Sequence, residues 1–534
     1  MCKAFVVKKL PPENSYGKTE YKLKLSNNAD KKRIERLASQ MKYRLAEGGG
    51  EAFYVIGVTD DGEPLGLKED ELKESILVLE KAASRIGAKI QVLRKVEGKR
   101  GLIAEVLVRL SREEKPPVQV TIAALGNVDA GKSTLIGVLC SGVLDNGNGL
   151  AMQKVARFLH EIKSGRTSSV SVHLLGFDDK GKIVNYSLIN PLDEPEIFLR
   201  SSKVLQFSDL GGHEKYLKTT LRGVMSKVPD YVMLVIAANS GLQVMGREHL
   251  GISIALRIPV FVVINKIDMV YEEKVEEVVS DVKRILKMPG INKLPIEIKD
   301  KDDIIISARH ISSGRIVPIF RVSSVTGEGL DELKYFLNII PPRMMWAEKM
   351  KNPLLIYVDE IFNVKGVGAV AGGLILSGIV NVDENLLLGP FKDGSWKNVR
   401  VKSIHINRVP SDKAFAGLDI TLALAGIKHD EIEKGMTLID ARSKPRSVRM
   451  FSARITILKH PTTITRGYQA VLHLNSIRST VKFKDMDKEV LRTGDTSNVI
   501  LEFLYHPWYV REGDIFVLRD ARTRAIGTII RIIQ

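Results

Sequence analysis

Cysteine is the scarcest feature of this sequence, with only Cys2 and Cys140 among 534 residues. Two cysteines cannot build a disulfide framework, and alone they cannot complete a zinc site. The sequence therefore excludes a small domain stabilised by disulfides and one stabilised by a cysteine-bound zinc ion. Cys140 lies in an apolar stretch, where we interpret it as a small core residue rather than a catalytic thiol.

Long apolar runs are also missing. No stretch approaches the roughly 20 residues that a membrane-spanning helix needs, and the N-terminus has no signal-peptide pattern. We therefore expect a cytoplasmic protein without a membrane segment. Apolar residues make up 44% and charged residues 27% of the chain, which is an ordinary globular balance. At 534 residues the chain is too long for one core, so about three to five domains are expected.

The chain carries a formal net charge of +17, but no polybasic tail concentrates this excess. Basic surfaces attract nucleic acids through counterion release. A solvated, generally basic surface explains the same charge equally well. Charge alone therefore leaves both an RNA-binding face and a solvated face open.

One stretch, residues 126–133, reads Gly-Asn-Val-Asp-Ala-Gly-Lys-Ser between two apolar runs. A strand before and a helix after such a loop are the context of a phosphate-binding loop. Gly126 and Gly131 let backbone N–H groups turn toward an anion, and the helix adds its positive end. Lys132 is expected to reach the β- and γ-phosphates, and Ser133 to bind Mg²⁺. The expected nucleotide contacts of this loop are Gly126, Asn127, Val128, Asp129, Ala130, Gly131, Lys132, Ser133 and Thr134.

Residues 118–343 alternate apolar strands with helical patterns, which is typical of an open α/β sheet. Such sheets bind ligands at the carboxyl ends of their strands, so polar residues at these ends are candidates for the site. The expected strands are residues 120–125, 204–209, 231–237, 260–265 and 319–323.

The second of these strands ends in Asp209-Leu210-Gly211-Gly212-His213. Asp209 can hold Mg²⁺, usually through water, and Gly212 can bring its N–H against the γ-phosphate because it lacks a Cβ. His213 can orient the attacking water and support the developing charge. A histidine after two glycines is more often a surface residue, but beside a phosphate-binding loop catalysis is favoured.

The fourth strand ends in Asn265-Lys266-Ile267-Asp268, and this motif indicates which nucleotide base is bound. The Asp268 carboxylate can accept hydrogen bonds from the N1–H and 2-amine of guanine, whereas adenine has an acceptor at N1 and no 2-amine. The sequence therefore predicts GTP rather than ATP. Asn265 is expected to support the loop and the purine, and the stem of Lys266 to cover the purine face. The next strand end is expected to close the base pocket with Ser323, Ser324 and Val325.

These motifs resemble those of the translational GTPases of the elongation factor Tu and elongation factor 1-alpha superfamily. Asp129 is a mark of that superfamily, and Ala130 and Ser133 are similar to its archaeal and eukaryotic branch. Residues 144–171, LDNGNGLAMQKVARFLHEIKSGRTSSVS, and residues 209–220, DLGGHEKYLKTT, resemble the switch regions of the GTP-binding protein 1-like subfamily. The resemblance implies a GTPase that hydrolyses GTP to GDP and phosphate, with catalytic residues His213, Lys132 and Asp129.

The same resemblance implies that Thr167 completes Mg²⁺ coordination with Ser133 and Asp209, with Ser168 as a second candidate. The chain also departs from the family here, because Ser164-Gly165-Arg166-Thr167 stands where other factors have Arg-Gly-Ile-Thr. In those relatives the isoleucine and a loop valine, here Val128, form an apolar gate beside the histidine. Arg166 cannot form that gate in the same way.

Beyond residue 343 the pattern changes to short strands with glycine turns, which predicts all-β barrels at residues 352–448 and 450–534. Both resemble the barrel domains of elongation factors. Residues 1–115 are expected to form a small mixed domain of unassigned role, with helical spacing at Ile34, Leu37, Met41 and Leu45. The predicted fold class is therefore an α/β P-loop GTPase domain followed by two all-β barrel domains and preceded by a small α/β domain.

With GTP or GDP and Mg²⁺ as cofactors, the expected function is a monomeric switch that binds aminoacyl-tRNA or the ribosome. The three-domain resemblance implies these partners. Two other classes stay open. One is a GTP-switched RNA-binding adaptor of mRNA surveillance or decay. The other is an auxiliary GTPase of a metabolic enzyme.

Overall fold

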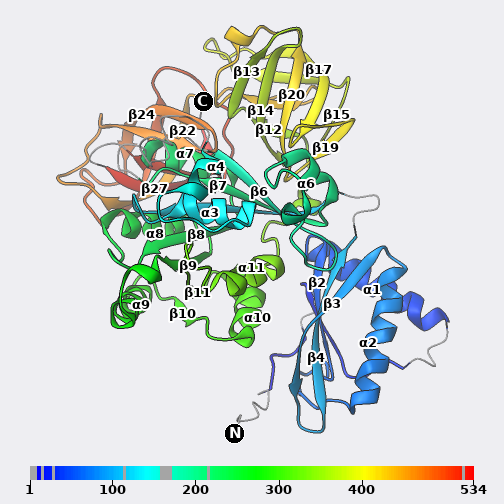
Figure 1. The fold of residues 1–534 in the computed structure, drawn as a ribbon. Coiled ribbons are helices and arrows are strands. Elements are labelled where there is room, and N and C mark those ends of the chain that lie inside the picture. Colours follow the sequence, from blue (N-terminus) through cyan, green and yellow to red (C-terminus); the bar gives the residue numbers. More distant parts are fainter. Residues whose placement is uncertain are drawn as a thin grey trace.

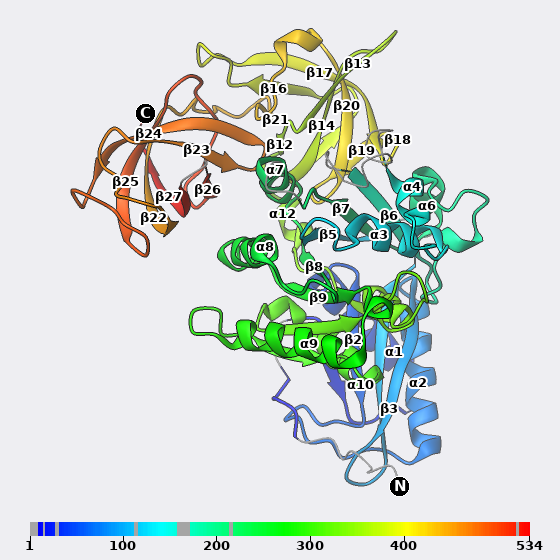
Figure 2. The same cartoon turned by 60° about the vertical axis from the view of Figure 1, so that its left-hand side comes forward.

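The computed structural model describes residues 9–13, 17–26, 31–111, 116–156, 171–212, 217–519 and 523–533. A small α/β domain, a central α/β domain and two β-barrels follow one another along the chain. The barrels lie together on one side of the central domain, and the N-terminal domain lies on the other (Figures 1 and 2). This arrangement confirms the predicted fold class. In the described part of the chain, no helix combines the length and the apolar character that crossing a membrane requires.

The N-terminal domain packs two helices on a four-stranded sheet. Its elements are β1 (Thr19–Lys22), α1 (Lys31–Glu47), β2 (Glu51–Ile56), α2 (Glu69–Ser84), β3 (Ala88–Glu97) and β4 (Leu102–Leu110). The strand order is β1-β2-β4-β3, with β1 parallel to β2 and β4 antiparallel to both neighbours. Leu37, Met41 and Leu45 are buried together with the apolar face of α2. The helical spacing in the sequence therefore predicted α1 correctly.

A seven-stranded sheet forms the centre of the second domain. Its strands are β5 (Val118–Gly126), β6 (Ser171–Phe177), β7 (Lys203–Asp209), β8 (Tyr231–Ala237), β9 (Val260–Asn265), β10 (Leu294–Glu297) and β11 (Ile316–Arg321). The order is β10-β11-β9-β8-β5-β7-β6, with β6 antiparallel to β7 and the other neighbours parallel. Apolar clusters bury both faces of the sheet, which explains the continuous apolar runs in its strands.

Helices cover this sheet and join its strands (Figure 1). Its described α-helices are α3 (Lys132–Ser141), α4 (Leu150–Val155), α6 (Glu194–Arg200), α7 (Leu217–Lys227), α8 (Val244–Ala255), α9 (Glu272–Lys287), α10 (Lys301–His310) and α11 (Leu330–Ile339). Helix α12 (Trp346–Lys349) follows the sheet and leads to the barrels. Short 3-10 turns are η1 (Asn185–Ser187), η3 (Ile267–Met269) and η4 (Ile311–Ser313). Cys140 is fully buried in α3, which confirms it as a small core residue.

Four of the five expected strands of this domain are confirmed, and the bounds of the fifth were wrong. The apolar run of β11 begins at Ile316 and passes through Pro318, so the strand ends at Arg321 and Ser323 lies in the turn that follows. Strands β6 and β10 were not predicted. Polar residues interrupt β6, and β10 is a four-residue edge strand that contains Pro295.

The barrel at residues 355–440, named the second barrel here, closes because β12 pairs with both β14 and β21. Its elements are β12 (Leu355–Tyr357), β13 (Glu360–Val364), β14 (Gly368–Ser377), β15 (Ile379–Asn381), β16 (Asn385–Gly389), β17 (Lys397–Ile406), β18 (Val409–Ser411), β19 (Lys413–Phe415), β20 (Asp419–Ala425), η5 (His429–Glu431) and β21 (Thr437–Asp440). Its core also takes in Ile197, Phe198 and Val204 of the central domain. Apolar packing therefore joins this barrel to the sheet that carries Asp209.

The barrel at residues 450–532, named the third barrel here, is closed, with the strand order β22-β25-β24-β23-β26-β27. Its strands are β22 (Met450–Lys459), β23 (Gln469–Leu474), β24 (Ile477–Met486), β25 (Thr496–Phe503), β26 (Ile515–Arg519) and β27 (Arg524–Ile532). Leu355, Tyr357 and Leu374 of the second barrel join its core. The two barrels therefore share one continuous apolar contact.

The face of the N-terminal sheet opposite α1 and α2 is buried against the central domain. Phe53 and Leu107 join the core cluster of the central sheet and its helices. At the edge of this contact, Lys203 Nζ lies 3.0 Å from Glu51 Oε2 and 2.8 Å from the Asn338 carbonyl oxygen. Arg109 Nε lies 2.7 Å from Glu51 Oε1. The N-terminal domain is thus tied to the first residue of β7, the strand that ends at Asp209.

We expect the substitution Glu51→Gln to destabilise this contact. Glu51 and Lys203 are fully buried, and Arg109 is 2% exposed, so removing the one carboxylate leaves two buried cations uncompensated. Burial already lowers the pKa of Lys203 to about 8. The loss should be about 3–5 kcal/mol, measured from the urea midpoint of the first unfolding transition. The exposed Glu97→Gln on β3 is the matched control, and equal midpoints for both variants would contradict the expectation.

Candidate nucleotide-binding site

The loop between β5 and α3 is turned sharply at its second glycine. Gly131 has φ of +84°, a conformation that L side chains rarely adopt. A Cβ at Gly131 would lie 2.5 Å from Asn265 Nδ2, so the loop packs directly on the end of β9. The phosphate motif and the base motif are therefore in contact. Val128, Ser133 and Thr134 are half-buried, Ala130 is buried, and Asp129 is exposed with φ of +58°.

Lys132 is held inside this loop. Its side chain is buried, and Nζ donates to the carbonyl oxygens of Asn127 at 2.7 Å and Gly126 at 3.4 Å. Burial lowers the pKa of Lys132, whereas Asp209 and Asp129 act to raise it. A buried ammonium held by neutral carbonyls gains from an anion beside it. The residues of the loop therefore fit a phosphate group.

The end of β7 lies against the same loop. Asp209 pairs in register with Ala124 of β5 and is 2% exposed. A Cβ at Gly212 would lie 2.5 Å from Lys132 Nζ and 2.7 Å from the Asn127 carbonyl oxygen. Only glycine therefore fits at this close approach. The Asp209 carboxylate and the Ser133 hydroxyl are oxygen donors of the kind that Mg²⁺ prefers.

The base motif is fixed by hydrogen bonds between two strand ends. Asp268 Oδ1 accepts a hydrogen bond from Ser323 Oγ at 2.5 Å. Asn265 Oδ1 accepts from Ser324 Oγ at 3.1 Å, and Asn265 Nδ2 lies 3.5 Å from the Ala130 carbonyl oxygen. Asn265 thus links the base motif to the phosphate loop. Two further predicted residues belong to the same edge, since Lys266 directly precedes η3 with φ of +63° and Val325 N–H donates to Ser323 Oγ.

The other predicted site residues lie outside the described part of the chain. These are His213, Thr167, Ser168 and Arg166. Their predicted positions are next to Gly212 and within the segment that joins α4 to β6. Their roles remain predictions.

Sequence reasoning missed a set of polar residues at the start of α8. The Asn127 side chain bonds to the Gln243 side chain, and Gly246 N–H donates to Asn127 Oδ1 at 2.7 Å. Gly126 N–H donates to His249 Nδ1 at 3.1 Å. A signal was available, because α8 follows β8 and so begins at the same carboxyl edge as the two motifs.

Neutral His249 holds Gly126, the first residue of the phosphate loop, through a hydrogen bond. Burial, together with the charges of Lys132 and Arg519, lowers the pKa of His249 to about 3 from its ordinary value of 6.5. Because Nδ1 accepts from Gly126 N–H, the proton of the neutral ring lies on Nε2. Protonation of Nδ1 would break this bond.

This shift predicts an acid-sensitive contribution to stability. Between pH 6.5 and 3 the unfolded chain binds the His249 proton and the folded chain does not, so stability falls as pH falls. The slope is about 1.4 kcal/mol per pH unit. His249→Asn keeps an acceptor near Nδ1 without titrating, so from pH 6.5 to 5 it should lose about 2 kcal/mol less than the wild type. Urea midpoints at several pH values measure the stability of both proteins. If stability depended on pH in the same way in the wild type and His249→Asn, the expectation would be refuted.

Ion pairs connect both helices beside the site to the barrels. Lys227, at the end of α7, has Nζ 2.6 Å from Asp419 Oδ2 and 3.4 Å from Asp359 Oδ2 in the second barrel. Burial acts to lower the pKa of Lys227, but the charges of Asp419 and Asp359 outweigh it and raise that pKa. On α8, Glu248 pairs with Arg524 at 2.8 Å in the third barrel. Ion pairs therefore link each of the two helices to a barrel.

A groove of about 500 Å³ lies between the central domain and the second barrel. Val155 at the end of α4 and His173 of β6 line one wall. Phe362, His405 and Arg408 of the barrel line the other. The groove therefore offers apolar and aromatic groups and charges of both signs beside the two elements that flank residues 157–170. Arg408 Nε lies 3.2 Å from Glu194 Oε2 within it.

Three protein-family models and several named relatives match this chain. The models of the elongation factor Tu GTP-binding domain, domain 2 and C-terminal domain match residues 118–361, 368–439 and 444–533. GTP-binding protein 1 of Xenopus laevis is 42% identical over 94% of this chain and 76% of its own length. GTP-binding protein 2 of Homo sapiens is 43% identical over 97% of this chain and 87% of its own length.

Solved structures share the fold. The elongation factor SelB of Methanococcus maripaludis, in complex with the GTP analogue GppNHp, matches with a TM-score of 0.56 at 18% identity. The match covers 79% of this chain and 80% of that protein. At this identity it supports the arrangement of the domains rather than any particular ligand.

Proposed function

Because the chain belongs to the elongation factor Tu-like GTPases that include GTP-binding proteins 1 and 2, we propose that it is a GTP-timed factor for aminoacyl-tRNA on the ribosome. It binds guanine nucleotide and hydrolyses GTP to GDP and phosphate. The observation that carries the tRNA proposal is the groove at the second barrel, because Val155 and Ser171 line it and flank residues 157–170 of the predicted switch I segment.

The proposed hydrolytic mechanism rests on charge stabilisation around the γ-phosphate. Lys132 exchanges its bond to the Asn127 carbonyl for phosphate oxygens, and the Gly212 N–H approaches the γ-phosphate where a Cβ would clash. His213 is the next residue and positions the attacking water. Mg²⁺ would supply positive charge that neutralises the phosphates. Its proposed ligands are Ser133, Thr167 and, through water, Asp209.

The switch works through the elements that flank the site. Loss of the γ-phosphate releases Thr167 and Gly212, and their segments continue into β6 and α7. Helix α7 holds the second barrel through Lys227, and β6 lines the groove. Hydrolysis thus changes the groove and the position of the barrel together. A ribosomal partner places the protein in the cytoplasm, and a monomer suffices because one chain carries every motif.

The groove is proposed to hold the aminoacyl end of tRNA. Phe362 and His405 offer rings for stacking, and the exposed Arg408 would exchange its ion pair with Glu194 for a backbone phosphate. We expect binding of aminoacyl-tRNA to be at least about tenfold tighter with GppNHp than with GDP. Arg408→Ala should weaken it about tenfold, because a charge-assisted contact is lost.

Fluorescence titration with labelled aminoacyl-tRNA measures both effects. Arg400→Ala is the matched control, since Arg400 is exposed on β17 of the same barrel but does not line the groove. Equal affinity with both nucleotides, or equal loss in the two variants, would overturn the tRNA proposal. In that case, recovery of exonuclease components with the GTP-bound protein would favour an adaptor of mRNA decay. GTP hydrolysis that depends on a metabolic enzyme would favour an auxiliary GTPase.

A further inference from the structure

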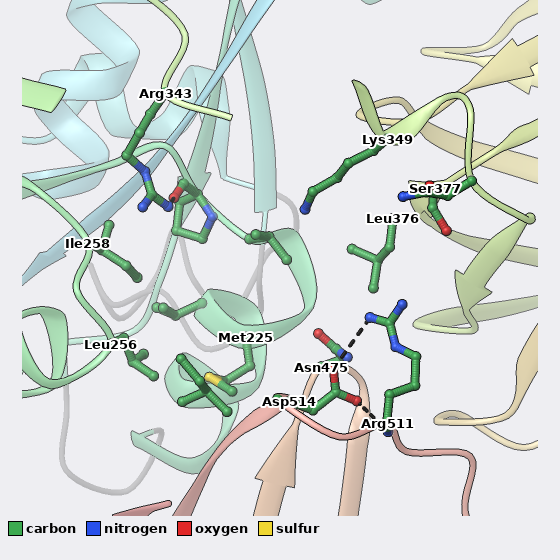
Figure 3. A pocket seen from close by; sticks show the side chains of 16 residues that line it. Met225, Leu256, Ile258, Arg343, Lys349, Leu376, Ser377, Asn475, Arg511 and Asp514 are labelled. Atoms are coloured by element: carbon green, nitrogen blue, oxygen red, sulfur yellow. Dashed lines mark hydrogen bonds and ion pairs between the residues drawn. The ribbon is translucent and has the colours of Figure 1, made fainter. Parts of the chain in front are cut away.

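A cavity of about 400 Å³ lies where the central domain and both barrels meet (Figure 3). The central domain contributes Met225 of α7 together with Leu256 and Ile258, which follow α8. These side chains make one wall of the cavity apolar (Figure 3). The volume is at the small end of the range for sites that bind small molecules, about 300–1,000 Å³.

The rest of the wall carries an excess of positive charge. Arg343, Lys349 and Arg511 line the cavity, and Asp514 is the one carboxylate among its described lining residues. Asp514 is already engaged, because its Oδ1 lies 3.3 Å from Arg511 and its Oδ2 accepts from Arg511 N–H at 2.8 Å. The cavity therefore keeps a net positive charge.

Among the described residues, the side chains of the two other cations make their direct contacts with neutral groups. Arg343 donates to the carbonyl oxygens of Pro229 at 3.2 Å and Arg257 at 3.5 Å. The buried Asp230 behind it accepts from backbone N–H groups, including that of Arg343 at 2.8 Å. Lys349 Nζ lies 4.9 Å from the centre of the Trp346 ring, and its side chain reaches toward the cavity (Figure 3). Burial, Arg511 and Arg343 lower the pKa of Lys349.

An anion beside Lys349 would relieve this charge. Nearby cations and partial burial disfavour the ammonium, and a negative group within a few ångströms reverses that effect. Apolar side chains on the facing wall favour an apolar body on the same ligand. A purely inorganic anion would leave that wall uncovered, and a purely apolar molecule would leave the cations unpaired.

We propose that this cavity binds a small organic anion, with an apolar body against Met225, Leu256 and Ile258 and an acidic group beside Lys349. Carboxylate, sulfonate and phosphate groups share the required chemistry. The ligand would touch the central domain and both barrels at once, so binding would stabilise this arrangement of the three domains. The site is separate from the nucleotide site and from the groove at the second barrel.

The experiment uses the full-length protein and the fluorescent anion 8-anilinonaphthalene-1-sulfonate as probe. Its neutral counterpart, N-phenyl-1-naphthylamine, has the same apolar body without the sulfonate. We expect the wild type to bind the anion about tenfold more tightly than the neutral compound. Lys349→Met should remove most of this preference, because methionine keeps the apolar stem and loses the charge.

Lys351→Met is the matched control, since Lys351 is exposed two residues away and does not line the cavity. It makes the same change in net charge, so a general effect of charge on probe binding would appear equally in both variants. A tenfold loss in Lys349→Met alone supports the site. Equal affinities of Lys349→Met and Lys351→Met for the anion, or equal binding of the two probes by the wild type, would overturn it.

Discussion

Replacing Asp268 by asparagine is expected to lower the affinity for GTP by about 10³-fold. The carboxylate would accept two charge-assisted hydrogen bonds from guanine, and the asparagine amide group would instead present a donor to guanine donors. Ser323 Oγ, which donates to Asp268 Oδ1 at 2.5 Å, holds the side chain in place for this contact. The loss therefore reports on the base contact itself rather than on a disordered side chain.

Xanthosine triphosphate provides the rescue for this variant. Xanthine carries a carbonyl oxygen at C2 where guanine carries an amine, so the asparagine amide can donate to it. Titration of both nucleotides into the wild type and Asp268→Asn should show a reversed preference. Asp281→Asn on α9 is the control, since the Asp281 side chain is 50% exposed and pairs only with Arg284 among its described partners. Unchanged GTP affinity in Asp268→Asn would remove Asp268 from the base pocket.

Replacing Gly212 by alanine is expected to slow single-turnover GTP hydrolysis by about 10²–10³-fold. The added Cβ would lie 2.5 Å from Lys132 Nζ and 2.7 Å from the Asn127 carbonyl oxygen, so the chain after Asp209 must move off the loop. The residue 212 N–H then cannot reach the γ-phosphate. GDP lacks that phosphate, so its affinity should stay within about twofold of the wild type.

Gly251→Ala is the control for this change. Gly251 lies in α8, and a Cβ there would meet nothing within 4 Å. Rapid-quench measurement of GTP cleavage and GDP titration separate the two effects. If Gly212→Ala cleaved GTP at the wild-type rate, residue 212 would not contact the γ-phosphate. If the variant lost GDP binding, the change would have disrupted the loop as a whole.

Local motifs explain how much of the site could be predicted from the sequence. The phosphate loop and the base motif each lie within a few residues, and the parallel sheet brings their strand ends together. The structure adds the contact between Gly131 and Asn265, which joins the two motifs. His249 could not be identified in the same way. It is one histidine in a helix, and only its bond to Gly126 reveals what it holds.

The docking of the N-terminal domain could not be predicted at all. Its ion pairs join Glu51 to Arg109 and Lys203, which lie 58 and 152 residues away in the sequence. Each residue taken alone is a charged position in a strand, which normally suggests a solvated face. Their burial follows from contact between two domains that fold around separate cores. The same reasoning applies to Lys227, whose partners Asp359 and Asp419 lie in the second barrel.

GTP turnover with ribosomes, with aminoacyl-tRNA, with both and with neither tests the central proposal most directly. We expect slow intrinsic hydrolysis and clear acceleration by ribosomes with aminoacyl-tRNA. His213→Ala should lose about 10²–10⁴-fold of the accelerated rate while it still binds GTP. Hydrolysis that ribosomes do not accelerate, together with unchanged intrinsic hydrolysis in His213→Ala, would contradict the account.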